Sequence, residues 1–151
     1  MGKLSKFKNS IRSAFNDSIY PGDTHIAHDE MADLQAAFEK KDCRDIPVDV
    51  AETWCTSTTL FTPEAFRYFL PAFLLGSIHD NAVEIGSYLI FALIPPKDPA
   101  QLAQFSETMA VFTEAQKHVI GDWVNDFLET NPFDNQAFTE TTRAFWTTVT
   151  A

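Results

Sequence analysis

The sequence predicts an all-α protein, a single globular bundle of about seven short helices around a buried central helix that a proline kinks. Two observations lead to this prediction. Apolar residues recur with the 3.6-residue helical period along most of the chain, and helix-capping residues rather than alternating hairpin patterns separate these segments. The length of 151 residues with 45% hydrophobic residues fits one all-α domain over residues 1–151.

The first two predicted helices lie before residue 41. The N-terminal one has an apolar face of Leu4, Phe7, Ile11, Ala14 and Phe15. Lys8 and Arg12 flank that face, so the helix either docks on the core or lies on a membrane as a basic amphipathic helix. We expect docking, because the rest of the chain is acidic. The second helix runs from about His28 to Lys40, and its apolar stripe consists of Ala27, Met31, Leu34 and Phe38.

A short third helix and the central helix follow. Asp45-Ile46-Pro47 starts the short one, which turns Val48, Ala51 and either Trp54 or Cys55 inward. Thr62 and Pro63 have the residue types of an N-cap and a first helical position, and Glu64 complements the helix dipole. The central helix is apolar on both sides, which is typical of a helix buried in a bundle. Pro71 inside it removes one backbone hydrogen bond and predicts a kink.

Four segments complete the prediction. Residues 83–94 form a buried helix in which Tyr88, Phe91 and Ile94 have helical spacing, although a strand over 88–94 is an alternative. Asp98-Pro99 caps the next helix, and Thr113 to Gln116 matches a capping box. The inner face behind this box consists of Gln116, Val119, Ile120, Trp123, Val124 and Phe127. Asn131-Pro132 caps the last helix, whose shared face consists of Phe138, Thr142, Phe145, Trp146 and Val149.

Charge is distributed unevenly along the chain. The net charge is −10, and residues 1–44 contribute none of it, since seven acidic side chains balance seven basic ones there. Residues 45–151 hold fourteen acidic and four basic side chains. Such an acidic field repels nucleic acid and anionic lipid and favours basic partners, although it also serves simply to keep a Phe-rich protein in solution.

Several classes of protein are disfavoured by the sequence. It contains no complete catalytic, P-loop or Rossmann motif, so we expect no cofactor and lean towards a protein that is not an enzyme. Cys43 and Cys55 lack the spacing of a redox pair or a zinc ribbon. The most apolar run, 85–94, is too short to cross a bilayer, and no secretory signal is evident. We therefore expect a cytoplasmic protein with two thiols.

The candidate binding residues lie on the predicted helix after Thr113. His118, Asp122, Asp126 and Glu129 follow one another at steps of four, four and three, so they share the face opposite Val119, Trp123 and Phe127. This face is either a solvated stripe or a binding surface for a basic protein partner. An exposed row offers no burial to shift a pKa, so a catalytic role for it is disfavoured.

Two clusters support the alternative hypothesis of a small enzyme. His79 and Asp80, with Arg67, would combine a general base with a cation. His25, His28 and Glu30 would make a metal-dependent site, but their spacing matches no standard ligand motif and we expect no bound metal. A third hypothesis is a nucleic-acid mimic, which would need two regular rows of acidic residues rather than one.

A specific motif occupies the central helix. The segment from Phe61 to Leu74, with the core TPEAFRYFLPAFL, resembles an uncharacterised family of small bacterial proteins that carries a domain of unknown function. The similarity extends more weakly over residues 25–130. It implies a bacterial, soluble and mainly helical protein, and it carries over no catalytic residue.

These observations favour a non-catalytic acidic binding protein. Small acidic inhibitors, such as immunity proteins that neutralise toxins, are the class that fits best, because a strong negative field speeds association with a basic toxin. The leading hypothesis is therefore an inhibitor or immunity-type protein. His118, Asp122, Asp126 and Glu129 are its candidate contacts.

Overall fold

The computed structural model describes residues 2–16, 20, 22, 32–78, 83–130 and 140–146. Helices make up most of these ranges and no strand occurs in them, so the all-α prediction is confirmed. The α-helices are α1 (Gly2–Phe15), α2 (Ala32–Phe38), α3 (Val48–Trp54), α4 (Pro63–Ser77), α5 (Val83–Ala92), α6 (Pro99–Ala110) and α7 (Glu114–Thr130). Two 3-10 helices, η1 (Cys43–Asp45) and η2 (Cys55–Leu60), flank α3, and residues 140–146 form a further helix.

The chain divides into two compact units, Met1–Ala92 and Leu93–Ala151. The first unit contains α1 to α5 with the two 3-10 helices, and the second contains α6, α7 and the helix over 140–146. That the whole length acts as one domain stays a prediction.

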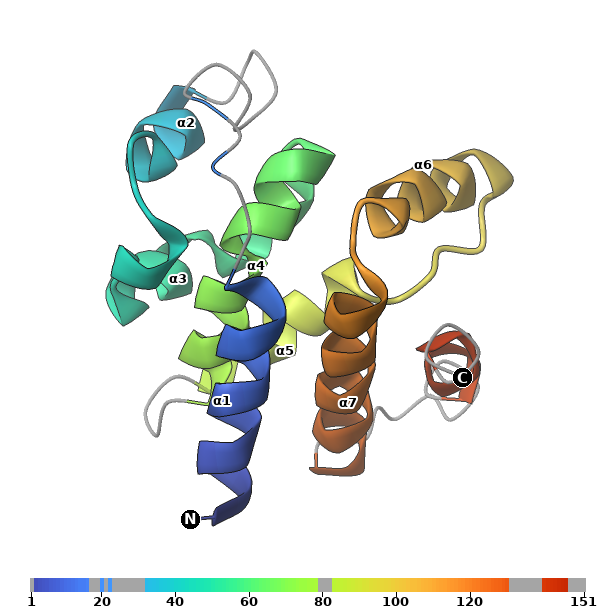
Figure 1. The fold of residues 1–151 in the computed structure, drawn as a ribbon. Coiled ribbons are helices and arrows are strands. Elements are labelled where there is room, and N and C mark those ends of the chain that lie inside the picture. Colours follow the sequence, from blue (N-terminus) through green and yellow to red (C-terminus); the bar gives the residue numbers. More distant parts are fainter. Residues whose placement is uncertain are drawn as a thin grey trace. The chain divides into compact units, whose positions relative to one another are not determined.

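Helix α4 forms the centre of the first unit. Ten of its fifteen residues are buried, and α1, α3, α5, η1 and η2 all contact it (Figure 1). Thr62 caps the helix, with its side chain accepting a hydrogen bond from the Ala65 N–H at 3.3 Å, and Pro63 follows at the first position. The helix continues without interruption past Pro71, although Pro71 has no N–H to donate to the carbonyl of Arg67. The predicted buried central helix is thus confirmed.

Aromatic rings fill the space around α4. Phe38 of α2 lies 5.0 Å, centroid to centroid, from both Phe61 and Phe69, and 6.0 Å from Phe73. The edge-to-face geometry of the first two pairs is the arrangement that ring quadrupoles favour. A close backbone approach also helps to fix the packing, since a Cβ on Gly76 would lie 3.0 Å from the Cδ1 of Ile85 on α5.

The helices before residue 41 pack as their apolar patterns predict. Ile11 and Phe15 are buried and α1 contacts α4, in agreement with a docked helix, whereas Arg12 is exposed. Leu34 and Phe38 are the buried residues of α2, while the predicted start of that helix, with Ala27 and Met31, lies outside the described residues.

A strained residue follows the C-terminus of α2. Lys40 has a φ of 61°, a left-handed conformation that is uncommon for a residue other than glycine or asparagine. Its N–H donates to the hydroxyl of Tyr20 at 2.6 Å, and the Lys41 Nζ donates to the carbonyl of Ala37 at 2.6 Å. These bonds supply partners at a helix end where the backbone groups would otherwise lack them.

Residues 83–92 form helix α5, as expected, but the prediction that Tyr88 and Phe91 lie on its buried face is wrong. Ile85, Leu89 and Ile90 are fully buried, whereas Tyr88 and Phe91 are 46% and 61% exposed. Both sets have helical spacing, so the period alone left the choice of inner face open. The aliphatic side chains occupy the inner face, and the two rings lie on the outer one.

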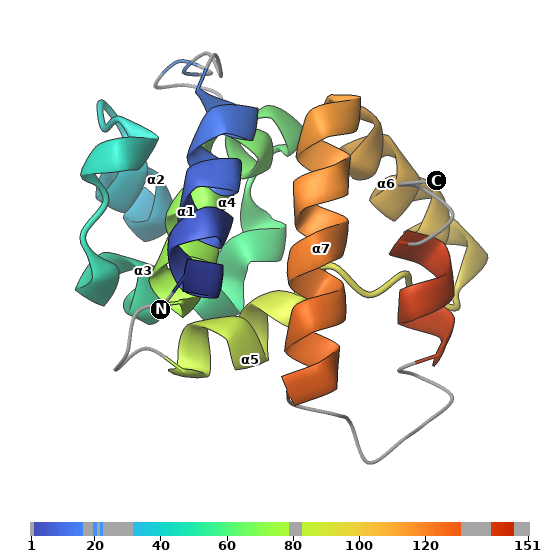
Figure 2. The same cartoon turned by 60° about the horizontal axis from the view of Figure 1, so that its bottom comes forward.

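In the second unit, a hydrogen bond joins two residues that lie far apart in the sequence. The Nε1–H of the buried Trp146 donates to the carbonyl of Leu93 at 2.7 Å. The ring of the neighbouring Phe145 lies 5.4 Å from that of Phe105, centroid to centroid. Figure 2 shows the helix over 140–146, in red, next to α6. The predicted cap of α6 is confirmed, because Asp98 Oδ2 accepts from the Gln101 N–H at 3.1 Å. None of the described helices is long and apolar enough to cross a membrane.

Candidate acidic binding face on helix α7

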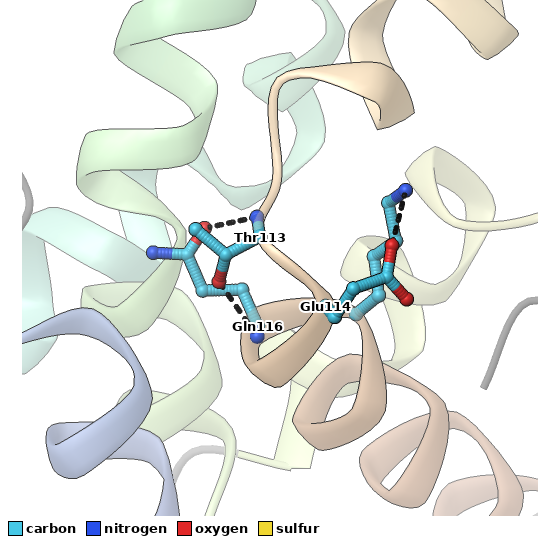
Figure 3. Close-up of polar contacts among 4 residues, drawn as sticks. Thr113, Glu114 and Gln116 are labelled. Atoms are coloured by element: carbon cyan, nitrogen blue, oxygen red, sulfur yellow. Dashed lines mark hydrogen bonds and ion pairs between the residues drawn. The ribbon is translucent and has the colours of Figure 1, made fainter.

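A capping box fixes the start of α7, the helix that carries the candidate residues. Thr113 Oγ1 accepts from the Gln116 N–H at 3.1 Å, and Gln116 Oε1 accepts from the Thr113 N–H at 3.0 Å (Figure 3). The box therefore satisfies two backbone donors that the helix start leaves without partners, as the sequence predicted. Gln116 is fully buried and therefore belongs to the inner side of the helix, as predicted.

One side of α7 is buried and apolar, as its period predicts. Val119, Ile120, Trp123 and Val124 are all less than one-tenth exposed. Phe127 is only half-buried and stacks on Trp123 at 5.2 Å, and Leu128 is buried instead. The inner face is thus rotated slightly from the predicted one at the end of the helix.

The predicted residues lie on the opposite side, which we call the α7 acidic face: His118, Asp122, Asp126 and Glu129. The side chains of His118 and Asp122 are 62% and 61% exposed, and Glu129 is exposed as well. At about 100° per residue these three lie within roughly 40° of one another around the axis, whereas Asp126 lies about 80° from His118. Asp126 is accordingly half-buried, at the edge of the face.

Charged side chains contact one another on and beside this face. His118 Nε2 lies 3.5 Å from Asp122 Oδ2, a pair that is ionic only when the histidine is protonated. Glu114 stands one turn before His118 and is 85% exposed, while Lys117, 3.6 Å from Glu114 and only 21% exposed, lies to one side. Glu114 therefore lies beside the face, one turn before its first residue. It is not among the residues predicted for this face, although its spacing of four from His118 indicates that the two share a side of the helix.

The chemistry available on this face is charge pairing. Three exposed carboxylates on one rigid helix are able to pair with lysine or arginine side chains of a partner. Each exposed pair contributes roughly 0.2–1 kcal/mol, and a row of them also speeds association at low ionic strength. In the part of the chain that the structure describes, no three His, Cys, Asp or Glu side chains are grouped in a way that would hold a metal ion.

Of the residues of the alternative enzyme sites, the structure describes only Arg67. Arg67 lies half-buried on α4, and its buried Nε has no hydrogen-bond partner among the described residues. The other members of these sites, His25, His28, Glu30, His79 and Asp80, lie outside the described residues. The thiol of the buried Cys55 donates to the carbonyl of Glu52 at 3.1 Å, which is consistent with a packing role.

Comparison with known proteins identifies a family. The sequence pattern of a family described as a family of unknown function (DUF6714) matches residues 3–150, nearly the whole chain, and the protein belongs to this family. The similarity inferred from the motif between Phe61 and Leu74 is thereby confirmed, over a longer stretch than expected. No curated protein and no solved structure matches the chain significantly.

Proposed function

We propose that this member of the family is a non-catalytic acidic protein that binds a basic protein partner through the α7 acidic face. The observation that carries the proposal is the exposure of His118, Asp122 and Glu129 along one side of a helix whose other side is buried. A buried inner face and a capped start keep the carboxylates at fixed spacing, which lowers the entropy lost on binding.

The net charge supports the same conclusion. The chain carries −10 overall, and its second unit alone holds eight acidic and three basic side chains. A field of this sign accelerates encounter with a basic surface and slows encounter with nucleic acid. An inhibitor or immunity-type protein acting on a basic toxin in the cytoplasm would use both properties. Fast encounter lets it find the toxin before the toxin reaches its substrate, and repulsion from nucleic acid keeps it free to bind.

The proposal is tested by affinity capture with matched variants. Tagged wild-type protein is incubated with a lysate of the source organism, washed at low salt and eluted at high salt. The test variant is Asp122→Asn with Glu129→Gln. The control variant is Glu52→Gln with Glu107→Gln, which also removes two negative charges, but from exposed positions on α3 and α6.

We expect a basic protein that the wild type and the control retain at low salt and that high salt releases. The test variant should bind the purified partner about two- to thirtyfold more weakly, from roughly 0.2–1 kcal/mol for each of two exposed pairs. Equal weakening by both variants would show that only net charge matters, and unchanged binding of the test variant would place the contact elsewhere. Failure to retain any basic protein would overturn the proposal.

The association rate gives an independent measurement. With the purified partner, stopped-flow fluorescence should show a rate constant that falls steeply as ionic strength rises, while the dissociation rate changes little. A rate constant that is the same at low and high salt would contradict the electrostatic basis of the proposal.

A further inference from the structure

No further inference is drawn: the strongest candidate, the half-buried guanidinium of Arg67 on helix α4, whose buried Nε has no hydrogen-bond partner among the described residues, carries nothing because Arg143 in the other unit shows the same feature and nothing in the structure shows what either would bind.

Discussion

The two units of the chain differ in how they use their helices. In the first unit, α4 is buried on nearly all sides, and the rings of Phe61, Phe69 and Phe73 pack closely around Phe38 of α2. In the second unit, α7 is buried on one side only and presents carboxylates on the other, while most of α6 is exposed. The comparison teaches that a sequence motif need not mark the exposed charges of a protein, because the motif from Phe61 to Leu74 lies on the buried helix whereas the exposed carboxylates lie on another helix.

Removing a ring from the aromatic core should have the largest effect. Phe73 is fully buried and lies close to Phe38 and Phe61, so Phe73→Ala should lower the free energy of unfolding by about 3–5 kcal/mol. Urea unfolding followed by circular dichroism measures this loss. Tyr88→Ala on the exposed side of α5 is the control and should cost much less. A similar loss for both variants would mean that the rings around α4 are not the stabilising core.

The second unit contains a buried long-range hydrogen bond between Trp146 and Leu93. Trp146→Phe removes the donor to Leu93 and leaves a buried carbonyl without its partner, so it should cost about 1–3 kcal/mol. Hydrogen exchange should show faster exchange of the amides of residues 140–146. Trp54→Phe, at a half-buried tryptophan of α3, serves as control. If the two substitutions cost the same, the bond between Trp146 and Leu93 does not hold this helix in place.

Helix caps allow the two units to be compared with the same change of residue. Thr113→Ala breaks one half of a reciprocal capping box, and Thr62→Ala removes the hydroxyl that accepts from the Ala65 N–H at the start of α4. Each substitution should lower the free energy of unfolding by about 1 kcal/mol. The loss should be larger at Thr113, because its hydrogen bond is shorter, 3.1 Å against 3.3 Å for Thr62, and belongs to a reciprocal pair. Thermal unfolding of both variants measures the difference. A larger loss at Thr62 would show that burial of α4, rather than the capping geometry, sets the cost.

Much of this architecture was predictable because its signals are local. Helical period and caps at Thr62, Asp98 and Thr113 depend on residues three or four positions apart, and the structure confirms all three caps. The bond from Trp146 to Leu93 was not predictable, because it joins residues 53 positions apart that only the folded chain brings together.

The helix ends before residue 61 show the same limit. The sequence gives no sign that Lys40 adopts a left-handed conformation, since this position more often holds glycine. Nor does it indicate the 3-10 helix η2, because a short tighter turn has no hydrophobic period of its own. Both features depend on what the surrounding helices require of a short connection.

The candidate site was predictable in part, for a related reason. Exposure of His118, Asp122 and Glu129 follows from the period of α7, since an apolar stripe on one side leaves the other to solvent. The half-burial of Asp126 follows from its angle around the same helix. What binds there does not follow from the period, because a solvated face and a binding face have the same pattern of residues in one sequence.

Neutralising the α7 acidic face should change stability least. Asp122 and Glu129 are exposed, and Asp122 contacts the similarly exposed side chain of His118. The double variant Asp122→Asn with Glu129→Gln should therefore shift the free energy of unfolding by less than about 0.5 kcal/mol for each substitution. Urea unfolding at neutral pH, with Glu52→Gln and Glu107→Gln as the matched control, measures this shift. If this face were only a solvated one, replacement of these carboxylates would change neither stability nor partner binding. A double variant that keeps its stability but loses partner binding would therefore separate the face that binds from the helices that fold, whereas a loss of several kcal/mol would mean that these carboxylates belong to the packing of the second unit.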